Sequence, residues 1–206
     1  MSQDVRLAKA LEILGLEAGP EARRGLLAYL ALLGKWNRTY NLTAIDDPEK
    51  MFTHHLLDSL AVAPHVDADR LLDVGAGAGL PGIPLAILHP GLAVTTLDAS
   101  EKKCSFMRQV AIELRLASLE VIHGRVERYQ PALPFPCIVS RAFSDLAEFV
   151  ALTRHLLAPG GRWLAMKGVL PREEMARLEG VRVVDCLPLA VPELDAERHL
   201  IIMEPA

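Results

Sequence analysis

The chain has 206 residues, of which 51% are hydrophobic and 23% charged, and its formal net charge is −4. No stretch approaches the roughly 18 to 20 uncharged apolar residues of a membrane span, and residues 1–6 mix acid and base, unlike a signal peptide. An acidic chain is no general binder of polyanions, so a nucleic-acid partner would need a local basic face.

The first third of the chain has helical periodicity. Apolar residues at helical intervals up to Leu16 predict one amphipathic helix, which ends near Gly15. Pro20 suits the first turn of a second helix, whose apolar stripe continues to Trp36. The segment 37–41 breaks that stripe, so we expect the second helix to end there.

A third helix is expected between two prolines, because Pro48 suits a helix start and Pro64 ends the pattern. The periodicity then changes near residue 70. We therefore divide the chain into an N-terminal helical extension, residues 1–66, packed on a core, residues 67–206. The two parts are expected to form effectively one globular unit.

From residue 70 onward, short apolar runs of strand type alternate with helical stretches. The strand-type runs are 71–74, 93–97, 119–122, 137–140 and 162–166. The helical stretches between them are 81–88, 102–114 and 146–157. This alternation predicts right-handed crossovers and a parallel sheet that is covered on both faces.

The end of the chain has a different pattern. Runs 181–184 and 199–203 have strand character, and the stretch between them is rich in proline and acidic residues. Too few residues separate them for another packed crossover helix. We therefore expect an antiparallel hairpin at the edge of the sheet.

A glycine-rich turn follows the first expected strand. Gly75, Gly77 and Gly79 stand between that strand and a helix, which is the context that makes a glycine motif informative. Glycine lets the backbone turn tightly and approach a ligand without a Cβ in the way. Asp98 ends the next strand, where a carboxylate can accept hydrogen bonds from both ribose hydroxyls of an adenosine. The segment 71–82 therefore predicts a nucleotide-cofactor site.

Two cofactors compete for this turn. The dinucleotide fingerprint G-x-G-x-x-G does not fit when it begins at Gly75, because Leu80 stands where the third glycine should be. It fits when it begins at Gly77, but its first glycine then comes late relative to the end of the strand. Asp73 favours S-adenosylmethionine, which has an ammonium and a sulfonium but no phosphate. The same carboxylate beside a pyrophosphate would weaken binding. A nicotinamide-dependent oxidoreductase and an ordinary tight turn stay as alternatives.

The chain resembles a known family over nearly its full length. The motifs that carry the likeness are Trp36-Asn37, Asn41-Leu42-Thr43-Ala44-Ile45, His55-Leu56-Leu57-Asp58-Ser59-Leu60, residues 73–84, Asp98 with Lys102-Lys103, Gly124-Arg125-Val126-Glu127, Ser140-Arg141-Ala142, Lys167-Gly168 and Arg198-His199-Leu200. They are similar to the bacterial ribosomal RNA small-subunit methyltransferase G family, also called glucose-inhibited division protein B. The elements before the turn are highly specific, whereas a glycine turn alone is weak evidence.

The resemblance implies a class I S-adenosylmethionine-dependent methyltransferase fold, which is a Rossmann-like, mostly parallel seven-stranded sheet with an antiparallel terminal hairpin. It implies methylation of guanine N7 at position 527 of 16S rRNA, near the decoding centre. We therefore expect a cytoplasmic enzyme whose partner is the small ribosomal subunit. The expected cofactor contacts are Asp73, Gly75, Gly77, Gly79, Leu80, Asp98, Val126, Glu127 and Arg141.

Three positions depart from the family's usual pattern. Ala76 and Ala99 stand where Thr and Ser are common, and Lys103 stands where Arg is common. The two alanines remove individual hydrogen bonds but leave the cofactor site. Lys103 keeps the charge but loses the planar fork that suits phosphate, so we rank it below Lys102 and Arg141.

The chemistry of the implied reaction limits which residues it needs. Guanine N7 carries an in-plane lone pair at neutral pH, so it attacks the methyl group without first losing a proton, and no general base is assigned. Asp58 is a candidate for positioning the substrate and stabilising its cationic product. An N-cap or a structural partner for His55 is the competing interpretation. Arg141 is the second positioning candidate, because it ends an expected strand.

The RNA side of the site is expected to be basic. The target guanine must lie in an open loop or be extruded, because the major groove of A-form RNA is too deep and narrow for side chains. The expected RNA contacts are Lys102, Arg125, Arg141, Lys167 and Arg198, with Lys35, Arg38 and Arg128 as further candidates. A solvated surface charge is the competing interpretation for each. Trp36 could stack on a base, but we favour a core position.

No metal site is expected. Cys104, Cys137 and Cys186 are widely separated and form no CxxC motif, which suits buried thiols in a reducing compartment. A helix directs the neighbouring His54 and His55 to different faces. We expect a monomer that uses no membrane. Two other functions stay open: methyl transfer to another acceptor, and a non-catalytic module that binds S-adenosylmethionine.

Overall fold

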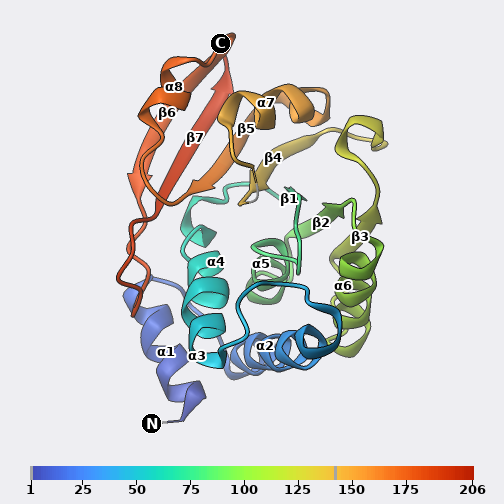
Figure 1. The fold of residues 1–206 in the computed structure, drawn as a ribbon, viewed down its shortest axis with the longest axis vertical. Helices are drawn as coiled ribbons and strands as arrows, with labels where there is room; N and C mark the ends of the chain where they lie inside the picture. Colours follow the sequence, from blue (N-terminus) through green and yellow to red (C-terminus); the bar gives the residue numbers. More distant parts are fainter. Residues whose placement is uncertain (1, 142) are drawn as a thin grey trace.

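The chain folds around a single sheet of seven strands within the residues that the computed structural model describes, 2–141 and 143–206 (Figure 1). The strands are β1 (Arg70–Val74), β2 (Ala93–Asp98), β3 (Leu119–His123), β4 (Phe135–Ser140), β5 (Leu157–Lys167), β6 (Val181–Pro188) and β7 (His199–Pro205). They lie in the order β3-β2-β1-β4-β5-β7-β6.

The sheet is parallel from β3 to β5, and β7 runs antiparallel to both of its neighbours, β5 and β6. The predicted parallel sheet and the terminal hairpin are both confirmed. Because β7 inserts between β5 and β6, the last strand of the chain is inside the sheet and β6 forms its edge. The strand order reverses beside β1, where the chain crosses from β3 to β4. Open sheets of this kind place ligands at that point.

Helices cover both faces of the sheet and form a further layer on one side of it. They are α1 (Gln3–Ile13), α2 (Pro20–Tyr40), α3 (Pro48–Lys50), α4 (Asp58–Leu60), α5 (Gly82–Leu88), α6 (Glu101–Glu113), α7 (Leu146–Thr153) and α8 (Arg172–Ala176). A π-helix, η1 (Met51–Leu57), joins α3 to α4. Three 3-10 turns complete the set: η2 (Ala63–His65), η3 (Val126–Arg128) and η4 (Arg154–Leu156).

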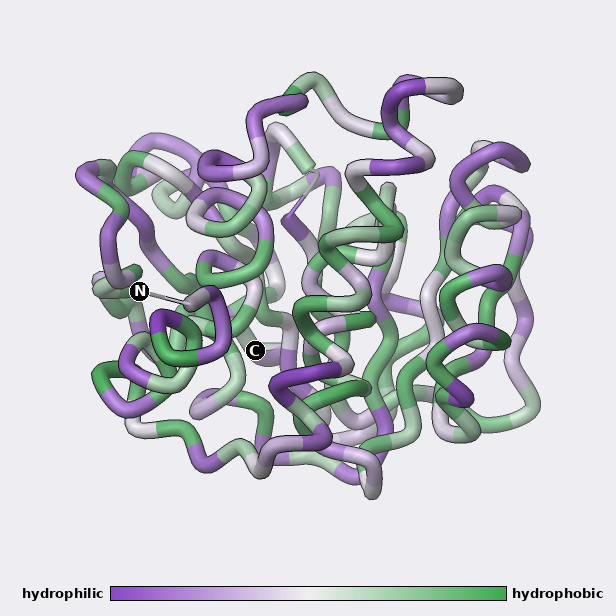
Figure 2. Tube along the Cα trace, turned by 90° about the horizontal axis from the view of Figure 1, so that it is seen from below, coloured by the Kyte–Doolittle hydropathy of each residue, from purple (hydrophilic) through white to green (hydrophobic). Residues whose placement is uncertain are grey.

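The alternation of side chains along the strands divides the core into two clusters. Leu71 belongs to a cluster that β1 shares with α2, α5 and α6, whereas the next residue, Leu72, belongs to a cluster under α7. Successive strand residues point to opposite faces, so a strand buried on both faces is apolar throughout. Figure 2 shows the accompanying pattern in the helices, whose tubes alternate between hydrophobic and hydrophilic segments.

The N-terminal helices pack on the helices that cover the sheet. α2 contacts both α5 and α6, α4 contacts α5, and their buried leucines belong to the same core cluster as Leu71. We propose that residues 1–66 act as an extension that folds together with the core. In the described part of the chain, every helix is too short or too polar to cross a bilayer.

Several helices differ from the sequence expectation. The single helix expected between Pro48 and Pro64 is divided into α3, the π-helix η1 and α4. α2 continues through the segment 37–41 as far as Tyr40, where we expected it to stop earlier. The helix accommodates Asn37 because its side chain bonds outside the helix, and it ends at Asn41, which adopts the left-handed conformation with φ of 48°. The short α8 was not expected, since its five residues are too few for a periodic pattern.

Candidate functional site

The candidate site lies at the carboxyl ends of β1, β2 and β4. The glycine turn follows β1, Asp98 ends β2, and Arg141 follows β4 directly. Because these strands are parallel neighbours, their carboxyl ends meet at one edge of the sheet. The structure therefore brings the predicted turn, the predicted acid and the predicted arginine together.

Backbone conformation explains the glycines of the turn. Gly75, Gly77 and Gly79 have φ of 69°, 61° and 87°, which L side chains rarely adopt. A Cβ at Gly79 would also lie 2.6 Å from Cγ1 of Ile83 in α5, so this glycine lets the turn pack on the helix. At Gly77, apart from its chain neighbours, the described atoms within 4.0 Å of such a Cβ are the Gly75 oxygen and the Lys103 ammonium. The surface of the turn is therefore open at Gly77.

Asp73 lies beneath the turn rather than beside it. Its Oδ2 accepts a hydrogen bond from the Gly82 N–H at 2.7 Å, and among the described residues its Oδ1 has no partner. The side chain is fully buried, and burial raises the pKa of this carboxyl to about 7. Asp73 therefore fastens the start of α5 to the end of β1 and leaves one oxygen unsatisfied. A cation near that oxygen would stabilise the buried negative charge of Asp73, whereas a phosphate would repel it.

Asp98 joins two turns through its carboxylate. Oδ2 accepts from the Gly77 N–H and Oδ1 accepts from the Ser100 N–H, both at 2.8 Å. Each carboxylate oxygen can accept more than one hydrogen bond, so lone pairs stay available for a ribose. The geometry fits the expected ribose contact and adds a second role, which is to fix the glycine turn against the end of β2.

A cavity of about 220 Å³ opens over the glycine turn. It is lined by Leu42, Thr43, His55, Gly75, Ala76, Gly77, Ala78, Leu80, Lys103 and Arg141. Four of the predicted cofactor contacts lie in this wall. Lys103 lies in it as well, although the sequence ranked that residue below Lys102.

A second cavity of about 360 Å³ adjoins the first. It is lined by Ile45, His54, His55, Asp58, Arg141, Met166, Lys167, Gly168 and Arg198. His55 and Arg141 belong to the walls of both cavities. A donor in the first cavity and an acceptor in the second would meet at these two side chains.

Asp58 is an ion-pair partner for two arginines. Its Oδ2 accepts from Nη1 of Arg141 at 3.0 Å and its Oδ1 accepts from Nε of Arg198 at 2.8 Å. The side chain of Asp58 is 4% exposed. From the sequence, the competing interpretation of Asp58 was an N-cap or a structural partner for His55. The structure gives this buried carboxylate a structural contact, but with Arg141 and Arg198.

His55 instead holds the loop that follows α2. Its Nε2 lies 2.8 Å from Oγ1 of Thr43. Burial lowers the pKa of this histidine to about 4, so the ring is neutral at physiological pH. Asn37 fixes the same loop by accepting from the Thr43 N–H at 2.9 Å and donating to the Ile45 carbonyl at 3.2 Å. These bonds give the motif at 36–45 a physical role as a wall of the first cavity.

Tyr29 is a site residue that sequence reasoning missed. It is fully buried in α2, and its hydroxyl donates to the Ala78 carbonyl of the glycine turn at 2.8 Å. Its apolar neighbours in the helix gave no reason to expect a polar contact 49 residues away. Trp36, by contrast, is partly buried and packs against the core residue Phe106 at a centroid distance of 5.6 Å, at the edge of the core that the sequence favoured for it.

Two of the predicted RNA contacts are occupied by the protein itself. Lys102 donates to the carbonyls of Tyr40 and Asn41, at 3.0 and 3.3 Å, and so caps the end of α2. Lys167 uses its three N–H groups on the carbonyls of Phe143 and Ser144 and on Glu174. Both ammonium groups are therefore held in part by backbone carbonyls that are distant in the sequence, and their contact with RNA stays a prediction.

The predicted residues that follow β3 lie at the same edge of the sheet but outside the two cavity walls. Arg125 is exposed. Val126 and Glu127 belong to the 3-10 turn η3, which follows β3. The segment lies close to Asp98, because the Gly124 N–H donates to the Asp98 carbonyl. Ala142, part of one family motif, lies outside the described residues. The described residues contain no cluster of histidine, cysteine or acidic side chains arranged for a metal ion.

Comparison with known proteins identifies the family. A family model described as rRNA small subunit methyltransferase G matches residues 23–201. The chain belongs to this family. It is 54% identical over 198 residues to the ribosomal RNA small subunit methyltransferase G of Methylobacillus flagellatus, with 96% of each chain covered. The protein of the same name from Aromatoleum aromaticum is 55% identical over 204 residues, covering 96% of this chain and 97% of that one.

Solved structures are similar in fold. The glycopeptide N-methyltransferase MtfA has a TM-score of 0.60 and 16% identity, and the match covers 78% of this chain and all of that one. A methyltransferase from Thiobacillus denitrificans, solved with S-adenosyl-L-homocysteine, has a TM-score of 0.57 and 17% identity, and the match covers 85% of this chain and 98% of that one. The predicted class I methyltransferase fold is confirmed.

Proposed function

We propose that this protein transfers the methyl group of S-adenosylmethionine to N7 of guanine 527 in 16S rRNA. Membership of the ribosomal RNA small subunit methyltransferase G family supports the donor and the acceptor. The observation that carries the proposal at the level of geometry is the pair of adjoining cavities, one over the glycine turn and one beside it. Their common wall is where a methyl group would pass from donor to acceptor.

The residues of the first cavity fit the proposed cofactor. S-adenosylmethionine supplies a methyl group activated by its sulfonium. Asp98 would hold the ribose. The open surface at Gly77 would let the cofactor approach the backbone of the turn closely. Lys103, in the cavity wall, would face the carboxylate of the methionine part. Oδ1 of Asp73, which has no partner in the described part of the chain, suits a positively charged cofactor. A pyrophosphate in its place would meet two carboxylates at the strand ends.

The chain's contribution to the reaction is orientation. Since N7 attacks with a lone pair that carries no proton, no side chain has to remove one. The neutral His55 is bound to Thr43, which fits a wall residue rather than a base. Holding two reacting groups in line supplies on the order of 7 to 11 kcal/mol in favourable cases. Arg141 is placed to contribute, because it reaches both cavities.

The second cavity would receive a base that has left its stack. Arg141 and Arg198 bring two positive charges to its wall, and Asp58 neutralises one of them. The remaining charge and the exposed Arg125 would attract the phosphates around the target. Extruding a base from its stack costs a few kcal/mol of free energy, and the cost is smallest in an open loop. The protein's acidic balance explains why recognition should need a folded RNA context.

Transfer of a tritiated methyl group tests the proposal. The enzyme and labelled S-adenosylmethionine are incubated with naked 16S rRNA, with small subunits and with whole ribosomes, all isolated from cells that lack the enzyme. We expect label in the 16S rRNA of at least one of these substrates, saturating at one site. A protein that binds the donor but labels none of the three would be a non-catalytic module, and the proposal would be wrong.

A further inference from the structure

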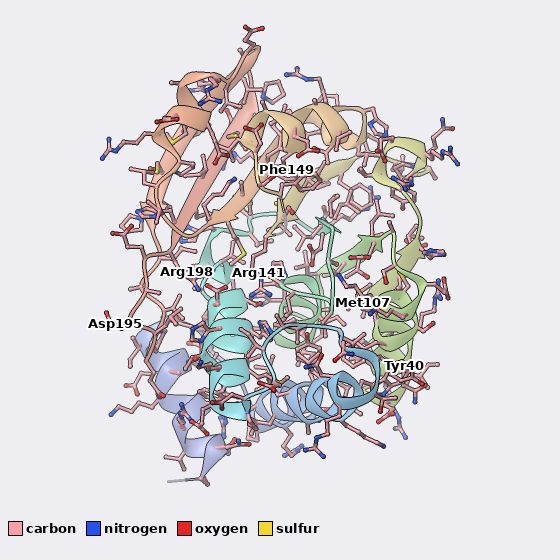
Figure 3. All side chains as sticks on the ribbon, in the orientation of Figure 1. Tyr40, Met107, Arg141, Phe149, Asp195 and Arg198 are labelled. Atoms are coloured by element: carbon pink, nitrogen blue, oxygen red, sulfur yellow. The ribbon has the colours of Figure 1, made fainter. Side chains whose placement is uncertain are left out.

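The carboxylate of Asp58 joins three distant segments of the chain. Asp58 begins α4, Arg141 follows β4 and Arg198 precedes β7, so its partners are 83 and 140 residues away in the sequence. Figure 3 shows Arg141 and Arg198 beside one another near the end of α4. Such a contact needs the helical extension, the parallel sheet and the terminal hairpin to be in place together.

The contact fixes the side chain that the two cavities share. Nη1 of Arg141 donates both to Asp58 and to the His54 carbonyl, each at 3.0 Å, so the guanidinium is held from two directions. The Asp58 side chain is only 4% exposed, and both of its oxygens face guanidinium groups. Asp58 is therefore placed to act on the reaction through its arginines rather than by touching the base.

We propose that Asp58 is a positioning residue for methyl transfer, which holds Arg141 at the wall between the cofactor cavity and the acceptor cavity. This inference rests on the proposed function. Without the carboxylate, the contact that Arg141 keeps among the described residues is the His54 carbonyl, so the long side chain gains freedom to leave the wall. An orientation error of about 1 Å is sufficient to cost about 100-fold in rate.

Glu204 provides a matched control within the same chain. Its carboxylate also bridges two arginines, Arg162 at 2.8 Å and Arg182 at 2.7 Å, on strands β5, β6 and β7. None of these three side chains lines either cavity of the site. Glu204→Gln therefore removes a carboxylate that bridges two arginines, at a more exposed position, without touching Arg141.

A double-mutant cycle tests the role of Asp58. The rate of methyl transfer at saturating donor and RNA is measured for the wild type, Asp58→Asn, Arg141→Ala and the double variant, with Glu204→Gln alongside. We expect Asp58→Asn to lower kcat about 100-fold in the wild type, and by no more than about twofold when Arg141 is already absent. Glu204→Gln should leave kcat unchanged. Calorimetry with S-adenosylmethionine and a cooperative thermal transition establish that each variant is folded.

The outcomes separate the inference from the function on which it rests. A wild type that transfers no methyl group contradicts the proposed function itself. If the wild type is active and Asp58→Asn lowers kcat equally with and without Arg141, Asp58 acts independently of Arg141 and the inference is overturned. An equal loss of kcat in Glu204→Gln would also overturn it. If Asp58→Asn does not fold, Asp58→Glu replaces it in the cycle. Asp58→Glu keeps the negative charge but moves it by the length of one methylene. The decrease in kcat that it causes should again disappear when Arg141 is absent.

Discussion

The carboxylate of Asp98 accepts two backbone N–H groups in the protein itself, from Gly77 and Ser100. Removing it should affect the glycine turn as well as a bound ribose. We predict that Asp98→Ala weakens S-adenosylmethionine binding by about 10- to 100-fold, the range expected when hydrogen bonds to a charged group are lost. Isothermal calorimetry measures the change. Asp185→Ala, at an exposed position in β6, should bind normally, and unchanged affinity in Asp98→Ala would remove the ribose assignment.

Gly79 has two independent reasons to be glycine, its φ of 87° and the contact that a Cβ would make with Ile83. We predict that Gly79→Ala lowers the free energy of unfolding by at least about 1 to 3 kcal/mol, the usual cost of such backbone strain. Denaturant titration provides the value. Gly91→Ala is the control, because a Cβ there meets no atom within 4 Å. Equal stability of the two variants would contradict this reason for glycine.

Asp73 gives the stability a pH dependence of defined sign. Burial raises the pKa of its carboxyl from 3.8 to about 7, so between these values the folded chain binds more protons than the unfolded chain. The free energy of unfolding should therefore fall as pH rises from about 4 to about 7. Asp73→Asn, which cannot ionise, should lose this part of the dependence. Parallel slopes for the two proteins, in denaturant titrations across that range, would show that Asp73 does not titrate there.

Individual charges marked the limit of what the sequence could predict at the residue scale. The sequence placed Lys102 and Lys167 among the RNA contacts, but it could not show that both ammonium groups also bind carbonyls of distant backbone. Asp58 was considered both as a catalytic group and as a structural one, but its two arginines could not be named. Spacing along the chain reports periodicity, whereas these partners depend on how the elements come together in space.

The loop between α2 and α3 is an element whose order depends on a few side chains. Thr43 bonds His55 through its hydroxyl, and its backbone is held by Asn37. We predict that Thr43→Val, which keeps the shape but loses the hydroxyl, raises the Kd for S-adenosylmethionine several-fold, because a net hydrogen bond contributes about 1 kcal/mol. Thr39→Val, at an exposed position in α2, is the control. A normal Kd for Thr43→Val would show that this bond does not order the cavity wall.

Strands and crossover helices were predictable because their patterns are local and repeat. Each expected strand lies within an observed one, and the hairpin followed from the short spacing between the last two runs. The end of α2 and the π-helix η1 were not predictable in the same way. Asn37 stays helical because its amide binds the following loop. Six of the seven residues of η1 are buried beside the site. Such π-helical turns are frequent at functional sites.

At the scale of the whole molecule, the structure combines an acidic chain with a basic site. The net charge is −4, yet the acceptor cavity has two arginines and one lysine in its wall, against one aspartate. Attraction to RNA is therefore local. Family membership and fold were predictable from the motifs, and the adjoining cavities were not, because their common wall comes from the extension, the sheet and the hairpin together.

The position of the transferred methyl group tests the central claim most directly. Small subunits from cells without the enzyme are incubated with the protein and S-adenosylmethionine, and the 16S rRNA is then analysed by mass mapping and by chemical cleavage specific for N7-methylguanine. The account predicts one new N7-methylguanine, at position 527, which is absent when the cofactor is omitted. A methyl group on another nucleotide, or on another atom of that guanine, would contradict it.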